Sequence, residues 1–307
     1  MTGRRKTAGS ESSARGPFRA GQVAIVGLPS VGKSTLVNAL VGARVAITSR
    51  RPQTTRGRLR GILTTDRAQF VFVDTPGFQT LHRSLLNARM SRAMRESLAD
   101  VDAIIVVLEA RGLGNAEREL LALLPQDVPA VVAVNKIDRL ADKSRLLPLL
   151  AEIAAARDVA AIVPISAAKA IGLGQLTREV ERHLPPGEAL FPADDLTDRD
   201  ERFLAAEFLR EKIFRQLGDE VPYAAAVAIE RFEQDGGLRR IHATVYVDKP
   251  GQRAILLGEG GARMKAIASA ARGDMERLFG GKVFLEVWVR VKRDWANDER
   301  MLTRLGY

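Results

Sequence analysis

The sequence predicts an α/β fold with a doubly wound, mostly parallel sheet, followed by a smaller α+β domain. Three observations predict it. The chain has 307 residues, more than one compact core usually holds. Short apolar runs alternate with amphipathic helical segments over residues 21–184. A stretch containing Pro, Asp and Gly at 185–197 is interpreted as a linker, and residues 198–307 then show a different order of elements.

Five apolar runs in the first half predict parallel strands. Their residues are almost continuously apolar, as in strands that are covered by helices on both faces. Ligands of such sheets bind at the carboxyl ends of the strands, so we expect the site there. The runs are residues 22–26, 69–73, 103–108, 130–134 and 161–164, and residues 34–41 are the first predicted helix.

Composition and charge narrow the classes of function. The chain is 46% hydrophobic and 27% charged, as in a soluble protein, and it has no cysteine, which excludes disulfides, thiolate metal sites and a cysteine nucleophile. The net charge of +10 favours a polyanionic partner, either RNA or an anionic membrane surface. Residues 1–20 are predicted to be a flexible tail. We expect a cytoplasmic protein, with peripheral contact at the inner membrane left open, and no stable oligomer.

The first motif follows the strand at 22–26 and opens the helix at 34–41. It is the phosphate-loop pattern G-x-x-x-x-G-K-S, whose glycines turn backbone N–H groups inward and whose lysine reaches the β and γ oxygens. Ser34 is expected to give its hydroxyl to Mg²⁺. The nucleotide-binding residues predicted here are Gly27, Pro29, Ser30, Val31, Gly32, Lys33, Ser34 and Thr35.

The second motif, Asp74-Thr75-Pro76-Gly77, ends the run at 69–73. The Asp74 carboxylate is expected to hold Mg²⁺, and the Gly77 N–H to bond the γ-phosphate. A plain Pro-Gly turn is the alternative interpretation. The position of the motif after a phosphate loop argues against it.

The third motif selects the base. Asn135-Lys136-Ile137-Asp138 ends the run at 130–134 and places a carboxylate where guanine presents two donors and adenine neither. A site built on such bonds rejects the wrong base by roughly 10⁴-fold or more. Lys136 is expected over the ring and the loop, and a backbone N–H of Ser166-Ala167 near the base oxygen.

Together these residues resemble the translation-factor-related GTPases, and within them the Era family of ribosome-assembly GTPases, over almost all of the chain from Gly21. By this resemblance, Ile47-Thr48-Ser49 and Pro52-Gln53-Thr54-Thr55-Arg56 are the first switch, in which Thr55, or alternatively Thr54, binds Mg²⁺. Lys33, Thr55 and Gly77 are then the expected catalytic residues. Phe78 stands where many GTPases have a water-orienting glutamine, so slow intrinsic hydrolysis is expected.

The second half predicts a helix, two strands, helices and a last strand. Thr197 and Asp198 are expected to cap a helix with one apolar face. The strands are predicted at 221–232 and 239–247, joined by a hairpin at Gly236-Gly237, and at 283–292. The apolar face of the helix consists of Phe203, Ala206, Leu209, Ile213 and Leu217, and that of the second strand of Ile241, Ala243, Val245 and Val247.

Within this half, Gly258-Glu259-Gly260-Gly261 stands before a helix. With the order of elements, it resembles the G-x-x-G turn of a type II KH domain, which clamps about four nucleotides. The RNA-binding residues so implied are Gly258, Glu259, Gly260, Gly261, Arg263 and Lys265. Further cations are Arg253, Arg272, Lys292 and Arg293. We interpret Phe279, Trp288 and Trp295 as packing residues rather than base-stacking ones.

The resemblance implies a molecular switch that uses GTP, GDP and Mg²⁺ and binds ribosomal RNA, at the 3′ end of the small-subunit RNA, during small ribosomal subunit assembly. Two other classes remain open at this point. A metabolic ATP-dependent enzyme would share the phosphate loop but not Asp138 in its motif. An RNA-binding scaffold would keep the second domain with a vestigial nucleotide site.

Overall fold

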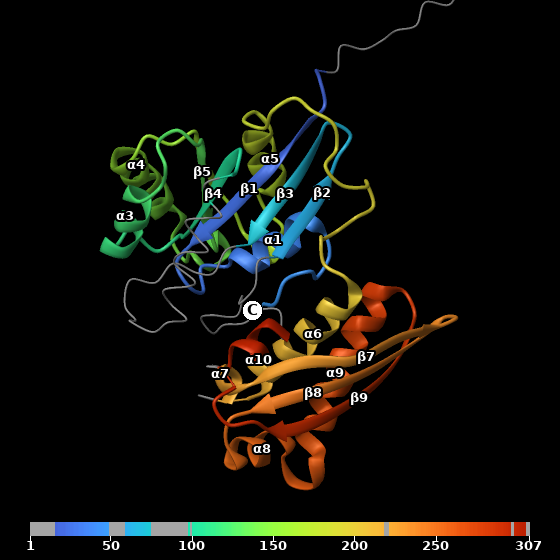
Figure 1. Ribbon diagram of the computed structural model, residues 1–307. Coiled ribbons are helices and arrows are strands. Elements are labelled where there is room, and N and C mark those ends of the chain that lie inside the picture. The colour runs from blue at the N-terminus through green and yellow to red at the C-terminus, as the bar shows by residue number, and fades with distance from the viewer. Residues whose placement is uncertain are drawn as a thin grey trace, which may run out of the picture.

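The computed structural model contains two sheets, one in each half of the chain (Figure 1). It describes residues 16–48, 59–74, 98, 100–217, 221–295 and 298–304. Within these residues, every helix is too short or too polar to cross a membrane.

The first sheet has six strands in the order β2-β3-β1-β4-β5-β6. All neighbours are parallel except β2 and β3. The five predicted strands are confirmed, but β2 was missed. It is an antiparallel edge strand and carries no continuous apolar run, which was the pattern used to find the others. The strands are β1 (Arg19–Gly27), β2 (Leu59–Thr64), β3 (Ala68–Asp74), β4 (Ala103–Glu109), β5 (Ala130–Asn135) and β6 (Ala161–Pro164).

Helices cover both faces of this sheet, so the doubly wound prediction is confirmed. On β1, Val23 and Ile25 belong to one core, with α1 and α5, whereas Ala24 and Val26 belong to the other, with α3 and α4. The elements are α1 (Lys33–Val41), α3 (Asn115–Ala122), α4 (Leu146–Ala156), α5 (Leu173–Glu181) and the 3₁₀ turns η1 (Ile137–Arg139), η2 (Lys143–Arg145) and η3 (Ala167–Lys169).

The stretch at 185–197 is hydrogen-bonded to strands β3 and β2 of the first domain. Gln69 of β3 is fully buried, and its amide group donates to the carbonyl of Phe191 at 2.8 Å and accepts from the N–H groups of Leu190 and Phe191. The Ile62 N–H donates to the carbonyl of Leu196. β1 itself begins at Arg19, inside the segment predicted as a tail, of which residues 1–15 lie outside the described part.

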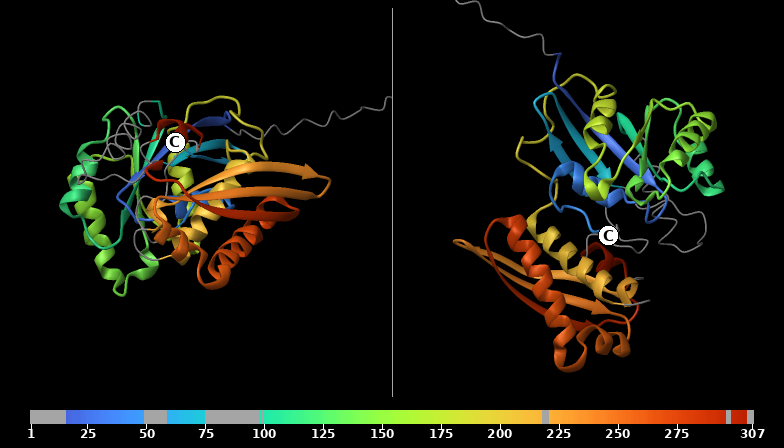
Figure 2. Two further views of the ribbon diagram at one scale, coloured as in Figure 1. Left: turned by 60° about the horizontal axis from the view of Figure 1, so that its bottom comes forward. Right: turned by 180° about the vertical axis from the view of Figure 1, so that it is seen from behind.

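The second domain has a three-stranded sheet, with β7 antiparallel to β8 and β8 parallel to β9. Helices α6 and α9 pack against each other over one face, as the right-hand view of Figure 2 shows. The predicted apolar residues of β8 are all fully buried there. The elements are α6 (Glu201–Gln216), α7 (Val221–Ala224), β7 (Ala226–Asp235), β8 (Leu238–Val247), α8 (Pro250–Leu257), η4 (Glu259–Gly261), α9 (Ala262–Phe279), β9 (Lys282–Val291) and α10 (Glu299–Arg304).

Two local predictions in this domain were wrong. The cap of α6 is Asp200, whose carboxylate accepts from the Phe203 N–H, whereas Asp198 accepts from the Arg60 N–H of β2. The predicted strand at 221–232 begins instead with the short helix α7. Pro222 has no N–H for a sheet ladder but is tolerated in the first turn of a helix, so strand β7 starts at Ala226.

The opposite face of this sheet is covered only in part. Trp295 is buried and packs with Met301 of α10 against Ala226, Ala228 and Tyr246. Phe279 is buried in the main core, so the packing interpretation holds for these two aromatic residues. Trp288 is 42% exposed and stacks on the ring of His242, so it does not belong to the core.

The contacts of Gln69 lead to a stability prediction. In Gln69→Leu, three hydrogen bonds to the backbone at Leu190 and Phe191 are lost, so unfolding should become easier by about 2–4 kcal/mol. Urea unfolding followed by circular dichroism measures this, with Gln126→Leu at an exposed glutamine as the control. A change at Gln69 no larger than that of the control would show that the linker is held by other contacts.

Candidate nucleotide site and nucleic-acid groove

The nucleotide motifs meet at the carboxyl edge of the first sheet. Parallel pairing places Ile25 opposite Asp74, Gly27 opposite Val107, and Glu109 opposite Asn135. The phosphate loop, the end of β3 and the end of β5 are therefore neighbours, as predicted from the strand order. Thr54, Thr55, Gly77 and Phe78 lie outside the described residues, so the switch assignments stay predictions.

The phosphate loop needs its glycines because its backbone is crowded. Gly32 has φ +106°, and a Cβ added there would lie 2.4 Å from Nδ2 of Asn135. At Gly27, a Cβ would lie 2.6 Å from the carbonyl oxygen of Val107. Ser30 also adopts positive φ, at 63°. A side chain at either glycine would displace the backbone that has to wrap around phosphate oxygens.

Lys33 begins α1 and is 8% exposed. Its Nζ donates to the carbonyl oxygens of Gly27 at 3.1 Å and Leu28 at 3.0 Å, which holds the ammonium across the loop. A cation and a helix amino terminus at one point make an anion site. Ser34 in the first turn of α1 and Asp74 at the end of β3 provide oxygen donors of the kind that Mg²⁺ prefers, so these residues fit the predicted metal.

Asn135 joins three of the predicted segments and is 2% exposed. Its Nδ2 donates to the carbonyl of Val31 at 2.9 Å, and its Oδ1 accepts from the N–H groups of Lys136 at 2.8 Å and Ala167 at 3.0 Å. One side chain thus fixes the phosphate loop and the loop after β6. The motif indicated Asn135, but its bonds to Val31 and Ala167 join segments distant in sequence and could not be predicted from the motif.

Lys136 lies over the phosphate loop, as expected. It has φ 65°, and its Nζ donates to the Ser30 carbonyl at 2.8 Å and contacts Oε2 of Glu109 at 3.1 Å. Glu109, at the end of β4, was missed because no motif includes it. The ion pair orients the Lys136 side chain across the site rather than into solvent.

Asp138 is held by Ser166, whose hydroxyl donates to its Oδ1 at 2.6 Å. This hydrogen bond, opposed by partial desolvation, lowers the pKa of Asp138 below its usual value. The carboxylate therefore stays charged at neutral pH and can accept from two guanine donors. The Ala167 N–H donates to Oδ1 of Asn135, and the expected contact of a backbone N–H of Ser166-Ala167 with the base oxygen stays a prediction.

The predicted G-x-x-G turn stands beside a groove in the second domain, and its last residue, Gly261, lines that groove. Gly258, Gly260 and Gly261 all have positive φ, between 56° and 80°, and the space around Gly260 is open. The groove has a volume of about 420 Å³ and runs between α9 and the edge strand β9. Among its lining residues are Leu257, Gly261, Met264, Lys265, Arg272 and Leu285.

The groove combines charges with an open backbone edge. Lys265 lines it, and Arg272 does so beside Glu276, whereas the guanidinium of Arg263 turns back to the Ile255 carbonyl. β9 is an edge strand, and its residues 285–287 line the groove. Backbone N–H and C=O groups at such an edge can bond the edges of unpaired bases.

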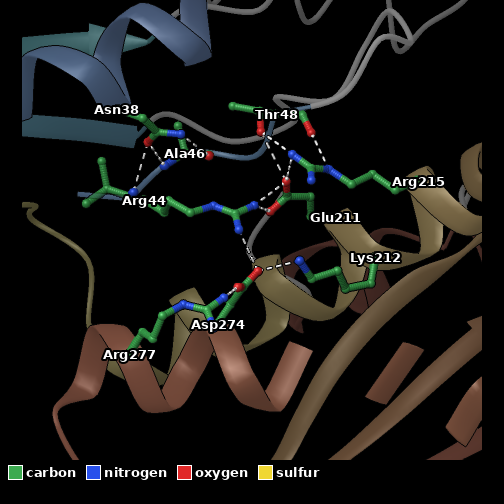
Figure 3. Close-up of polar contacts among 10 residues, drawn as sticks. Asn38, Arg44, Ala46, Thr48, Glu211, Lys212, Arg215, Asp274 and Arg277 are labelled. Atoms are coloured by element: carbon green, nitrogen blue, oxygen red, sulfur yellow. Dashed lines mark hydrogen bonds and ion pairs between the residues drawn. The ribbon is translucent and has the colours of Figure 1, made fainter. Parts of the chain in front are cut away.

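The two domains contact each other through a buried charge cluster (Figure 3). Arg44, in the loop after α1, donates to both carboxylate oxygens of Glu211 on α6 at 2.6 Å and to Asp274 on α9 at 2.7 Å. Both acids have side chains only 2% exposed. Asp274 also pairs with Lys212 and Arg277. Burial lowers the pKa of Lys212, and Glu211 partly offsets this.

This cluster reaches the start of the predicted first switch. The Thr48 hydroxyl donates to Glu211 at 3.1 Å, and Arg215 donates to the hydroxyl and carbonyl oxygens of Thr48. Asn38 of α1 fixes the loop between, because its Oδ1 accepts from the N–H groups of Val45 and Ala46. The loop before residue 49 is thus fastened to α6 and α9 (Figure 3).

Comparisons with known proteins agree with the two halves of the site. Residues 22–136 match the family described as 50S ribosome-binding GTPase, and residues 220–296 match the KH domain. The chain is 50% identical over 290 residues to GTPase Era of Nitrosomonas eutropha, covering 94% of this chain and 98% of that protein. It is 52% identical over 293 residues to GTPase Era of Xanthomonas oryzae pv. oryzae, covering 95% and 98%.

Two solved structures are similar over the same length. One is an Aquifex aeolicus Era variant bound to GDP and AlF₄⁻, with TM-score 0.90, 36% identity and coverage of 94% of this chain and 99% of that one. The other is Era in complex with MgGDPNP and nucleotides 1506–1542 of 16S ribosomal RNA, with TM-score 0.89 and the same identity and coverage. The fold class expected from the resemblance is confirmed.

The geometry at Asp138 predicts that a substitution there changes which base the site prefers. Asp138→Asn should weaken GTP binding by about 100-fold or more and favour xanthosine triphosphate, because xanthine has an acceptor where guanine has its amino donor. Equilibrium titration with labelled nucleotides measures both affinities. Unchanged GTP affinity would remove Asp138 from the base site.

A substitution at Asn135 is expected to change nucleotide affinities in a different way. In Asn135→Ala, the phosphate loop and the loop at Ala167 lose their common partner, so affinities for GTP, GDP and xanthosine triphosphate should all fall by about 10- to 100-fold. The same titration measures this, with Asn115→Ala at an exposed asparagine as the control. A loss confined to guanine nucleotides would argue that Asn135 contacts the base alone.

Proposed function

The chain belongs to the Era family of GTPases, and on that premise we propose that its groove binds the 3′ end of small-subunit ribosomal RNA during assembly of that subunit. It binds and hydrolyses GTP through its first domain. The observation that carries the RNA proposal is the groove between α9 and β9, combined with the similarity to a structure that holds 16S ribosomal RNA. The metabolic ATP-dependent class is not supported.

We assign the hydrolysis to a small set of groups. Lys33 and the N–H groups of the phosphate loop bind the β and γ oxygens, while water attacks the γ-phosphate in line. Ser34, Asp74 and Thr55 would hold Mg²⁺, which spreads the charge that develops on these oxygens. Gly77 is assigned to the γ-phosphate. The position of Lys33, whose Nζ is held over the loop by the carbonyl oxygens of Gly27 and Leu28, supports its role.

Base recognition rests on Asp138, with Ser166 as its positioning residue. The hydroxyl of Ser166 keeps one carboxylate oxygen in place and charged, so little reorganisation is required when guanine binds. Asn135 and Lys136 connect this loop to the phosphate loop, at Val31 and Ser30. The loop proposed to bind the base and the loop proposed to bind the phosphates are therefore bonded to each other.

RNA recognition rests on the turn at Gly258, Glu259, Gly260 and Gly261, on Lys265 and on the edge of β9. The turn lets a sugar-phosphate backbone approach the start of α9, which adds partial positive charge. Arg272 is added to the predicted set because it lines the groove. Arg263 is proposed to contact phosphate from the rim.

The two activities are proposed to be coupled through Arg44. γ-Phosphate binding orders switch loops in GTPases, and Thr48 belongs to the start of the predicted first switch. Because Thr48 and Arg44 are bonded to α6 and α9, a movement of the switch changes contacts at the second domain. RNA would then bind one nucleotide state more tightly, and by linkage would raise the affinity for that nucleotide equally.

Gly260→Asp tests the groove. It places a carboxylate against the expected phosphate path and should weaken RNA binding at least about 10-fold, leaving nucleotide affinity intact. Aspartate and asparagine both tolerate positive φ, and the space around Gly260 is open, so the fold should persist. Gly260→Asn is the uncharged control. Binding of an RNA matching nucleotides 1506–1542 is measured by gel shift. Equal affinity for the two variants would contradict the assigned path.

Arg44→Ala tests the coupling. For the unmodified protein, the ratio of RNA affinities with a non-hydrolysable GTP analogue and with GDP should be about 5 to 150. Without Arg44 this ratio should approach 1, because the loop loses the bonds of Arg44 to α6 and α9. Arg118→Ala, at an exposed ion pair with Glu152, is the control. A ratio near 1 in the unmodified protein would mean tethered domains without a switch.

Two expectations about partners stay predictions, namely a monomer and a peripheral contact with anionic membrane. The net charge of +10 supports attraction to an anionic surface. Sedimentation with phosphatidylglycerol vesicles tests the membrane contact. The assay is run at about 0.15 M salt, because a weak surface attraction is screened there. Analytical ultracentrifugation tests the oligomeric state.

A further inference from the structure

The uncovered face of the second sheet carries exposed aromatic side chains. On β9, Phe284 is 46% and Trp288 is 42% exposed. His242 of β8 stands between them, 5.7 Å from the Trp288 ring and nearly parallel to it at 16°, and 6.1 Å from the Phe284 ring. We call His242, Phe284 and Trp288 the aromatic platform. It lies on the face opposite α6 and α9, beyond the part that α10 covers.

The platform is flanked by cations that have no acidic partner among the described residues. These are Arg240, Lys282 and Arg290, all exposed and all on β8 or β9. The acids around them are engaged. Glu286 contacts His242 at 3.0 Å, and Glu230 accepts from the Tyr246 hydroxyl at 3.1 Å. Glu233 pairs with Arg231. The surface therefore favours a ligand with both negative charge and flat rings.

The platform is continuous with the groove. Residues 285–287 of β9 line the groove, and Phe284 and Trp288 flank this segment on the same strand. A chain that leaves the groove across the edge of β9 meets the platform next. Single-stranded RNA has the required chemistry, because its phosphates match the cations and every base presents a face for stacking.

We propose that the aromatic platform is a second RNA-binding surface, on which an unpaired base stacks against Trp288 while phosphates contact Arg240 and Arg290. It extends the path of the RNA beyond the groove of the proposed function. The groove clamps about four nucleotides, so only a longer RNA reaches the platform. Length dependence therefore separates the two sites.

Tryptophan fluorescence tests the stacking directly. The chain has two tryptophans, of which Trp288 is exposed and Trp295 is buried. An RNA of about 12 nucleotides from the proposed ribosomal sequence should quench the exposed one. Trp288→Phe should lose this quenching while keeping most of the affinity, and a tetranucleotide should give none. An RNA that binds without quenching Trp288 would overturn the proposal.

Affinity gives the second readout. Trp288→Ala should weaken binding of the longer RNA by about 5- to 150-fold, the usual range for one stacked base, and leave the tetranucleotide unaffected. Leu147→Ala, at another exposed apolar residue, is the control. Gly260→Asp should weaken both RNAs, so failure of the groove is recognised separately. Equal loss for both RNAs with Trp288→Ala would place Trp288 in the groove and overturn the proposal. A loss seen only with intact small subunits and not with naked RNA would identify a ribosomal protein as the ligand instead.

Discussion

The side-chain amide of Asn135 joins three loops that are far apart in the sequence, and the nucleotide site depends on it. It bonds the phosphate loop at Val31, its own loop at Lys136 and the loop after β6 at Ala167. An asparagine suits this position because one short side chain supplies both donors and acceptors in a buried place. Gly32 lies so close to it that any side chain at this position would collide with Asn135. Phosphate and base recognition are thus parts of one rigid unit.

A second constraint governs the relation between the domains. Glu211 and Asp274 are almost completely buried, and a buried carboxylate without a partner costs several kcal/mol. Arg44 supplies charge to both, together with neighbours on α6 and α9. Arg44 adds to the pairing that Arg215 gives to Glu211 and that Lys212 and Arg277 give to Asp274. It is through this contact that the proposed coupling between the domains would act.

The second domain uses its sheet differently on its two faces. One face packs against α6 and α9 and provides the stability of the domain, while the other is covered by α10 and Trp295 at one end only. The strand β9 at the edge belongs to both the groove and the uncovered face. Because a strand directs alternate side chains to opposite faces, β9 can complete the core with one set and present aromatic and basic residues with the other.

The sequence by itself determined the parts of this protein whose chemistry is local. Phosphate binding requires glycines and a lysine at fixed spacing, guanine requires the carboxylate of Asp138, and buried parallel strands require continuous apolar runs. These could be recognised without a structure, and so could the family. Only the tertiary structure decided the contacts between distant residues: Ser166 with Asp138, Glu109 with Lys136, and Arg44 with Glu211. It also decided local choices between competing partners, such as Asp200 instead of Asp198 as the cap of α6, and the exposure of Trp288. Sequence patterns describe the neighbours of a residue along the chain, whereas burial and pairing depend on which segments meet after folding.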